Sequence, residues 1–283
     1  MRILITGAKG QLGTALQQVL ADDDLVLKDL PDFDLSDSAC EDQIVSARPE
    51  VILHAGAYTN VDGAEREPDR AKAVNVRGTT HVAQAAQTLQ ARLIYFSTDY
   101  VFDGEKKTPY LEEDPPRPVN QYGLSKYEGE QAALTLCKNT LVVRTAWLYG
   151  QAGQNFVKTI MRLTNERPTL EVVADQRGCP TYADDLARAI KQLLAGEMRG
   201  TCHVTNGGDC TWHEFAQAIV GQMGMKTTVL PITTAQAGRL ARRPAYSVLS
   251  TERFAKHCSP LPHWREALRR FMNRVPHLAS ATG

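Results

Sequence analysis

The stretch Ile5-Thr6-Gly7-Ala8-Lys9-Gly10-Gln11-Leu12-Gly13 decides the fold of this chain. It joins a short apolar run, Ile3–Thr6, to the segment Gln11–Leu20, in which apolar residues recur at helical spacing. A glycine-rich turn between a buried strand and a helix lets a pyrophosphate approach the free N–H groups at the positive end of the helix dipole. The spacing GxxGxxG is one residue longer than the GxGxxG fingerprint. The stretch predicts a dinucleotide site, with a tight turn that binds no ligand as the alternative.

An acidic residue, Asp29, follows the second expected strand. A carboxylate at this position can accept hydrogen bonds from the adenosine ribose hydroxyls, and it disfavours a 2′-phosphate. The cations Lys9 and Lys28 are close enough in sequence to offset that repulsion, so these residues leave NADH and NADPH both open. Asp34 and Leu35 are expected near the adenine, and the alternative for Asp34 is a helix or turn cap.

Strand and helix signals alternate along the first half of the chain. We expect strands at Ile3–Thr6, Leu25–Leu27, Val51–Leu53, Leu93–Phe96 and Leu141–Val143, and helices at Gln11–Leu20, Cys40–Ala47, Ala71–Leu89 and Gln121–Leu136. Continuous apolar strands separated by helices indicate a parallel sheet that is buried on both faces. The fold class is therefore α/β, with a doubly wound, Rossmann-type sheet that binds ligands at the carboxyl ends of its strands.

The alternation loosens in the second half of the chain. There we expect helices at Phe156–Glu166, Asp184–Leu194 and Trp212–Met223, and strands near Leu170–Val173 and Cys202–Thr205. We therefore predict a dinucleotide-binding Rossmann domain over residues 1–150. Residues 151–283 are expected to form mainly a smaller lobe that binds the substrate, with some segments returning to the Rossmann core.

The composition narrows the function classes. Lys and Arg together number 32, and so do Asp and Glu, so the formal net charge is zero and no general attraction to nucleic acid or anionic membrane is expected. The six cysteines form no CxxC pair and no zinc-ligand spacing, which indicates free thiols in a reducing compartment. The apolar run Ile3–Ile5 is too short for a signal peptide or a membrane span. We therefore expect a cytoplasmic protein without a membrane or nucleic-acid partner.

Tyr122 and Lys126 are four residues apart on an expected helix, so they share one face. This pair suits carbonyl reduction, because hydride addition turns a ketone into an alkoxide that needs a proton. A phenol has a pKa of about 10, and a nearby ammonium favours the phenolate and lowers that pKa toward neutrality. We expect Tyr122 to donate the proton and Lys126 to tune its pKa; a surface pair is the alternative.

A second clue lies at the end of the strand Leu93–Phe96, where Ser97 and Thr98 follow. A strand-end hydroxyl can hydrogen-bond to a substrate carbonyl and to the oxyanion that develops from it. We choose Thr98 over Ser97 for this role, with a turn cap as the alternative. The glycine turn, the strand-end hydroxyl and the Tyr–Lys pair, in this order along the chain, indicate a carbonyl reductase that uses a nicotinamide cofactor.

This order resembles the extended short-chain dehydrogenase/reductase family, and within it the dTDP-4-dehydrorhamnose reductases. The resemblance covers essentially the whole chain. The stretches that carry it are Gly7–Gly13, Ala55–Asp62, Ser97–Gly104, Asn120–Lys126, Arg144–Tyr149, Asn155-Phe156, Asp175–Thr181 and Arg243-Pro244 with Ser247 and Leu249.

The resemblance implies a role for each matching residue. The catalytic set is Thr98, Tyr122 and Lys126. The residues implied in cofactor binding are Gly7, Gly10, Gln11, Leu12, Gly13, Asp29, Asp34, Leu35, Ala55, Gly56, Ala57, Tyr122 and Lys126. The residues implied in contact with a dTDP-linked deoxysugar are Thr98, Asp99, Tyr122, Trp147, Asn155 and Arg243, and the alternative for Trp147 is a core aromatic.

The implied reaction is reduction of the C4 ketone of dTDP-4-dehydro-L-rhamnose to dTDP-L-rhamnose, a polysaccharide precursor. The implied cofactor is NADP(H), with NAD(H) also accepted, and the implied state is a monomer or a homodimer. Some relatives dimerise around magnesium through a glutamate that Ala15 replaces here, so no metal is expected.

Two rivals stay open. An epimerase or a dehydratase of the same fold is one, although dehydratases place an Asp-Glu pair beside the threonine and here Tyr100 follows Asp99. The other is a non-catalytic NADP-binding protein like the regulatory subunit of methionine adenosyltransferase.

Overall fold

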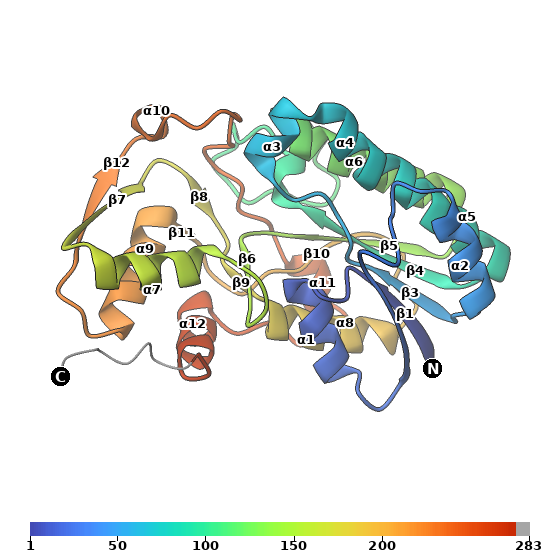
Figure 1. Cartoon of the computed structure of the whole chain (residues 1–283). Coiled ribbons are helices and arrows are strands. Elements are labelled where there is room, and N and C mark those ends of the chain that lie inside the picture. The colour runs from blue at the N-terminus through green and yellow to red at the C-terminus, as the bar shows by residue number, and fades with distance from the viewer. Residues whose placement is uncertain (276–283) are drawn as a thin grey trace.

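The computed structural model describes residues 1–275 and is built around a six-stranded sheet (Figure 1). The strand order is β10-β5-β4-β3-β1-β2, and every neighbouring pair is parallel. The strands are β1 (Arg2–Thr6), β2 (Asp24–Lys28), β3 (Val51–His54), β4 (Arg92–Thr98), β5 (Thr140–Thr145) and β10 (Gly200–His203). The predicted doubly wound parallel sheet is confirmed, because the order reverses between β1 and β3 as in Rossmann-type folds.

Helices cover both faces of this sheet (Figure 1). Successive strand residues point to opposite faces, so Ile3 and Ile5 pack in one core and Leu4 packs in the other. The first core contains α1 (Gln11–Val19) and α8 (Ala183–Leu194). The second contains α2 (Ala39–Ala47), α5 (Thr79–Leu89) and α6 (Gln121–Leu136). Because all six strands are parallel, each presents its carboxyl end to the same edge of the sheet.

The helical stretch expected at Ala71–Leu89 is confirmed, but it is not one regular α-helix. The chain instead forms α3 (Val61–Arg66), α4 (Pro68–Lys72), a π-helical segment η1 (Ala73–Gly78) and then α5. Within η1, the Asn75 side chain bonds to both the N–H and the C=O of Tyr58 and donates to Ser125 Oγ. A π-helical segment re-aims side chains within a helix, and here it aims Asn75 at the neighbouring helix α6.

The second half of the chain has a core of its own and also completes the sheet. α7 (Phe156–Glu166), α9 (Trp212–Gln222) and α12 (Trp264–Met272) pack with the strands β7 (Thr169–Val173) and β12 (Thr228–Ile232) in that core. The short elements are η2 (Asp99–Val101), β6 (Leu148–Tyr149), β8 (Arg177–Gly178), β9 (Thr181–Tyr182), β11 (Cys210–Thr211), α10 (Thr234–Ala237) and α11 (Glu252–Ala255). β10 and α8 join the Rossmann layers, and a domain boundary near residue 150 stays a prediction.

A search of residues 1–275 finds no helix with the length and apolar character that a membrane crossing requires. All six cysteines lie in the described part of the chain, and none forms a disulfide there.

A buried ion pair ties helix α6 to strand β5. Arg144 Nε donates to Glu130 Oε1 at 2.9 Å, and Arg144 Nη2 donates to Glu130 Oε2 at 2.7 Å. The Glu130 side chain is fully buried and that of Arg144 is 4% exposed. Removing one member of such a pair leaves the other charge buried without a counter-ion. The pair therefore fixes the helix that carries Tyr122 and Lys126.

We predict that Glu130→Gln lowers the free energy of unfolding by about 3–5 kcal/mol, because the Arg144 guanidinium stays buried. Urea denaturation followed by circular dichroism measures this change. The matched control is Glu166→Gln, which breaks the exposed pair between Arg162 and Glu166 and should cost less than about 1 kcal/mol. Equal losses in the two variants would contradict a special role for the buried pair.

Candidate active site

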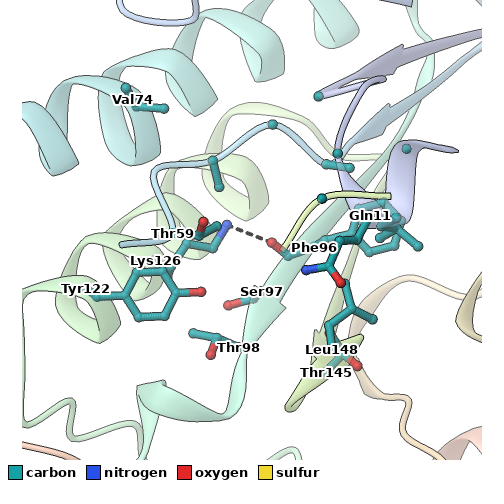
Figure 2. Close-up of a pocket in the computed structure, with 18 of the residues that line it drawn as sticks. Gln11, Thr59, Val74, Phe96, Ser97, Thr98, Tyr122, Lys126, Thr145 and Leu148 are labelled. Atoms are coloured by element: carbon teal, nitrogen blue, oxygen red, sulfur yellow. Dashed lines mark hydrogen bonds between the residues drawn. The ribbon is translucent and has the colours of Figure 1, made fainter. Parts of the chain in front are cut away.

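A cleft of about 780 Å³ opens at the carboxyl edge of the sheet. Its walls come from the turn after β1, the ends of β3, β4 and β5, the first turns of α6, and the loop before α7. Figure 2 shows the side chains of Tyr122, Lys126, Ser97 and Thr98 gathered in one part of this cleft. The residues predicted for catalysis therefore share one cleft with the glycine turn.

The glycine turn packs too closely for side chains. Gly7 has a φ of +65°, and a Cβ there would lie 2.6 Å from the backbone N of Gly56. A Cβ on Gly13 would lie 2.2 Å from the carbonyl oxygen of Gly7. Helix α1 begins after Gly10 without a side-chain cap, so its first N–H groups are free to bind an anion. The cradle fits the pyrophosphate of a dinucleotide.

Asp29 lies at the cleft end that is expected to hold the adenosine. Its carboxylate accepts hydrogen bonds from the backbone N–H of Lys9 at 2.7 Å and of Leu30 at 2.8 Å. The two cations considered as offsets point elsewhere: Lys9 Nζ donates to the Leu30 carbonyl, and Lys28 Nζ donates to Gln43. The Asp29 charge therefore has no side-chain cation bonded to it in this structure, within residues 1–275.

Asp34 and Leu35 also line the cleft, together with Ala55, Gly56 and Ala57. The Asp34 carboxylate accepts from the N–H and the hydroxyl of Ser36, which lowers the pKa of Asp34. This is the turn cap that the sequence left open for Asp34. Leu35 is buried, and a Cβ on Gly56 would come within 2.7 Å of its side chain, so Leu35 forms part of the cleft floor.

Helix α6 positions the Tyr–Lys pair. Asn120 caps it by accepting from the Gly123 N–H, as the Asn-x-x-Gly spacing allows. Lys126 Nζ donates to the Phe96 carbonyl at 2.7 Å and lies 4.1 Å from the centroid of the Tyr95 ring (Figure 2). Burial lowers the pKa of Lys126 to about 7, although Glu130 acts in the opposite direction.

The expected lowering of the tyrosine pKa is wrong for this structure. Desolvation at the cleft wall and, to a smaller extent, the Asp99 charge raise the pKa of Tyr122 to about 12, although the Thr98 hydroxyl acts in the opposite direction. Lys126 Nζ donates to the Phe96 carbonyl rather than to the Tyr122 hydroxyl. Tyr122 is therefore fully protonated at neutral pH, which is the form that a proton donor requires.

Three hydroxyls lie at the ends of β4 and β5. Thr98 Oγ1 accepts from the Tyr100 N–H at 3.2 Å and donates to Asp99 Oδ1 at 3.1 Å. Ser97 and Thr145 are different, because within residues 1–275 their buried hydroxyls have no hydrogen-bond partner. Unpartnered buried hydroxyls in a cleft are free to bind a ligand. Thr98 both lies near Tyr122 in the cleft and caps the turn at η2, so the turn-cap alternative for Thr98 is also confirmed.

Trp147 lies in a sandwich rather than in the core. Its ring stacks on Trp212, with centroids 3.5 Å apart and planes at 7°. On another side it meets Gly178, where a Cβ would come within 2.6 Å of the indole nitrogen. Trp147 has a φ of +46°, a strained backbone conformation that this packing holds. Both tryptophans line the cleft, so the stack forms a flat wall for a ligand.

Asn155 and Arg243, both implied in contact with the dTDP-linked deoxysugar, differ in placement. Asn155 lines the cleft, caps α7 through the Lys158 N–H, and donates to Gln11 Oε1 at 3.2 Å. Arg243 is not among the residues that line the cleft, and its guanidinium pairs with Asp62 at 3.0 Å.

The sequence interpretation missed several residues of the cleft wall, including Trp212, Thr145 and Thr59. Thr145 carried a usable signal, because it lies two residues after an expected strand, as Thr98 does; in the structure the two threonines are paired in the sheet. Trp212 carried no local signal, since its place depends on a contact with a residue far away in sequence. Within residues 1–275 no cluster of His, Cys, Asp and Glu side chains suits a metal ion.

The doubly wound sheet, the glycine cradle and the Thr–Tyr–Lys set define the class of short-chain dehydrogenase/reductase proteins. More narrowly, residues 1–276 match the family described as the RmlD substrate binding domain, and the chain belongs to that family.

Relatives and solved structures agree with this family assignment. The chain is 39% identical to a dTDP-4-dehydrorhamnose reductase of Sinorhizobium fredii, covering 96% of this chain and 97% of that protein. It is 38% identical to the spore coat polysaccharide biosynthesis protein SpsK of Bacillus subtilis, with 96% of each covered. A dTDP-4-dehydrorhamnose reductase of Bacillus anthracis in complex with NADP superposes with a TM-score of 0.93, at 44% identity, covering 96% of this chain and 98% of that one.

We predict that Gly178→Ala displaces the Trp147 indole, because the new methyl group would overlap a ring that Trp212 holds from its face. The near-ultraviolet circular dichroism of the indoles should change, and the free energy of unfolding should fall by about 1–3 kcal/mol. Gly221→Ala, on the same helix as Trp212, meets open space and should leave the spectrum as it was. An unchanged spectrum in Gly178→Ala would contradict the packing of Trp147 between Trp212 and Gly178.

Proposed function

We propose that this protein reduces the C4 ketone of dTDP-4-dehydro-L-rhamnose to dTDP-L-rhamnose, with NADPH as the hydride donor. The observation that carries the proposal is the meeting of Thr98, Tyr122 and Lys126 in the cleft that also contains the glycine cradle. The names of the relatives support the substrate, and the Bacillus anthracis structure with NADP supports the cofactor.

The residues of the cleft fit a nicotinamide dinucleotide. The uncapped start of α1 offers N–H groups to the pyrophosphate, and the unpartnered hydroxyls of Ser97 and Thr145 are available to its other polar groups. When bound, NADPH supplies the hydride that attacks the ketone carbon. The resemblance assigns Lys126 to the ribose next to the nicotinamide.

The protein's own part in the reaction is to bind the ketone and to supply a proton. Tyr122 holds its proton at neutral pH because its pKa is about 12, and an alkoxide is basic enough to take that proton. The Thr98 hydroxyl would hydrogen-bond to the same oxygen and stabilise its developing charge. The stacked Trp147 and Trp212 would form one wall for the sugar nucleotide.

The rivals fit less well. A dTDP-glucose 4,6-dehydratase of Streptomyces venezuelae shares the fold at 19% identity with a TM-score of 0.83, but here Tyr100 occupies the position after Asp99 where dehydratases place a glutamate. The intact Thr98, Tyr122 and Lys126 set disfavours a non-catalytic regulatory subunit. A relative in Streptomyces antibioticus, 39% identical, is a probable 4-ketoreductase of another dTDP sugar, so the sugar is the finer part of the proposal.

The remaining assignments are also proposals. The six thiols without disulfides support a reducing compartment such as the cytoplasm. The state is proposed to be a monomer or a homodimer. Ala15, on α1, is buried in the core that α1 shares with α8, and its methyl side chain offers no ligand for a magnesium-linked dimer.

We predict that Tyr122→Phe lowers kcat for dTDP-4-dehydrorhamnose by about 100-fold or more, because the proton donor is lost, while NADPH still binds. Reduced-nicotinamide absorbance gives kcat, and cofactor titration gives the dissociation constant. The control Tyr127→Phe removes a hydroxyl from the same helix outside the cleft and should keep kcat within about twofold. Near-normal turnover by Tyr122→Phe would sink the mechanism.

We predict that Asp29→Asn improves KM for NADPH relative to NADH by about fivefold. The variant removes a charge near the expected 2′-phosphate, which is worth about 1 kcal/mol. Its one remaining oxygen can accept from one of the two backbone N–H groups, of Lys9 and Leu30, that bond to the carboxylate. Parallel kinetics with the two cofactors measure the ratio. If the ratio stays constant, Asp29 does not face the 2′ position.

A further inference from the structure

A buried carboxylate lies beside the catalytic hydroxyl, and within residues 1–275 no charged side chain is bonded to it. Asp99 is 2% exposed, and its two oxygens accept from two neutral hydroxyls. Thr98 Oγ1 donates to Oδ1 at 3.1 Å, and Ser247 Oγ donates to Oδ2 at 2.5 Å. A carboxylate that is buried with only neutral partners is costly, and it tends to take up a proton instead.

The single hydroxyl hydrogen of Thr98 can be donated either to Asp99 or to a substrate carbonyl, but not to both. A hydroxyl has one hydrogen to donate, and in this structure Thr98 gives it to Asp99 while its oxygen accepts from the Tyr100 N–H. While Asp99 is ionised, that hydrogen is not available to a ketone oxygen in the cleft. A protonated Asp99 no longer needs it and can itself donate to Ser247 Oγ, which frees the Thr98 hydrogen to turn into the cleft.

We propose that Asp99 and Ser247 are positioning residues: a protonated Asp99 turns the Thr98 hydroxyl toward the substrate carbonyl, and the Ser247 hydrogen bond governs how readily that proton is lost. The inference rests on the proposed ketone reduction and adds to it a control over the donor. Ionisation of Asp99 then withdraws Thr98 from the substrate and slows the reduction.

The surroundings of Asp99 agree with this role. Burial raises the pKa of Asp99 to about 7, while the hydrogen bonds from Ser247 and Thr98 lower it. The titratable groups that face it are Tyr100 on η2, Tyr122 on α6 and Cys179 after β8, and the charge of Asp99 raises the pKa of each. All three are neutral near pH 7, so Asp99 loses its proton before they do.

The protonation of Asp99 makes the rate of reduction depend on pH. The protonated form of Asp99 is present below about pH 7 and is lost as the pH rises, so reduction should decline on the alkaline side. Lys126, one turn along α6 from Tyr122, also titrates near pH 7 and contributes to the same limb. Arg243 interacts with Tyr100 and lowers the pKa of that phenol. A variant that acts on Asp99 alone is therefore needed to separate the contribution of Asp99 to the alkaline limb from that of Lys126.

Ser247 allows this separation, because its backbone is held independently of its hydroxyl. The Ser247 N–H donates to the Arg177 carbonyl at 2.8 Å, and the next residue, Val248, accepts from the Tyr110 N–H at 2.8 Å. Both bonds survive in Ser247→Ala. The Ser247 hydroxyl donates to Asp99, so removing the hydroxyl acts on that carboxylate.

The experiment is the pH profile of kcat/KM for dTDP-4-dehydrorhamnose with NADPH. Ser247→Ala removes a bond that favours the ionised carboxylate, so the part of the alkaline limb due to Asp99 should move up by about one pH unit, while the part due to Lys126 stays near pH 7. Ser250→Ala makes the same change three residues on, where the hydroxyl does not touch Asp99, and should leave the limb in place. A purely structural effect of Ser247→Ala would lower kcat/KM at every pH without moving the limb, and that result would overturn the proposal.

A second variant tests the inference with a measurement that does not require enzyme turnover. In Asp99→Asn the side chain is neutral at every pH, so the part of the limb due to Asp99 should disappear. Infrared difference titration of the cofactor-free protein should show a buried carboxyl that loses its proton near neutral pH and is absent in Asp99→Asn. Its absence in wild type would also overturn the proposal. If wild type lacks reductase activity at all pH values, the proposed function fails as well, whereas an active enzyme with an unmoved limb refutes only the role of Asp99.

Discussion

The backbone of Gly7 approaches that of Gly56 so closely that a Cβ has no room between them. This contact between the end of β1 and the end of β3 sets the position of the glycine turn, and Gly13 repeats the constraint between the turn and helix α1. The uncapped start of α1 consequently faces the cleft. The remaining site residues follow from the parallel sheet, whose strands all end at this edge.

Burial controls the chemistry of the site more than direct ion pairing does. It holds Tyr122 protonated, lowers the pKa of Lys126 to about 7 and raises that of Asp99 to about 7. One ion pair, between Glu130 and Arg144, fixes α6 against β5 from behind. Lys126 and Asp99 therefore change charge near neutral pH, beside a proton donor, Tyr122, that stays protonated there.

The sequence was sufficient for features that depend on local pattern. The bounds of α6 agree with the prediction, and Asn120 provides the cap at its start. It was insufficient where a contact joins distant segments: the stack of Trp147 on Trp212, the pairing of Arg243 with Asp62, and the bond from Ser247 to Asp99. The direction of the Tyr122 pKa was also missed, because desolvation depends on the whole fold.

The most direct test of the account follows the hydride itself. The protein is given dTDP-4-dehydrorhamnose with NADPH that carries deuterium at both C4 positions of the nicotinamide, and the product is read by NMR and mass spectrometry. The account predicts net oxidation of the cofactor and a single deuterium at C4 of the product sugar. A product without deuterium at C4, or a sugar converted with no net cofactor oxidation as an epimerase would do, would contradict it.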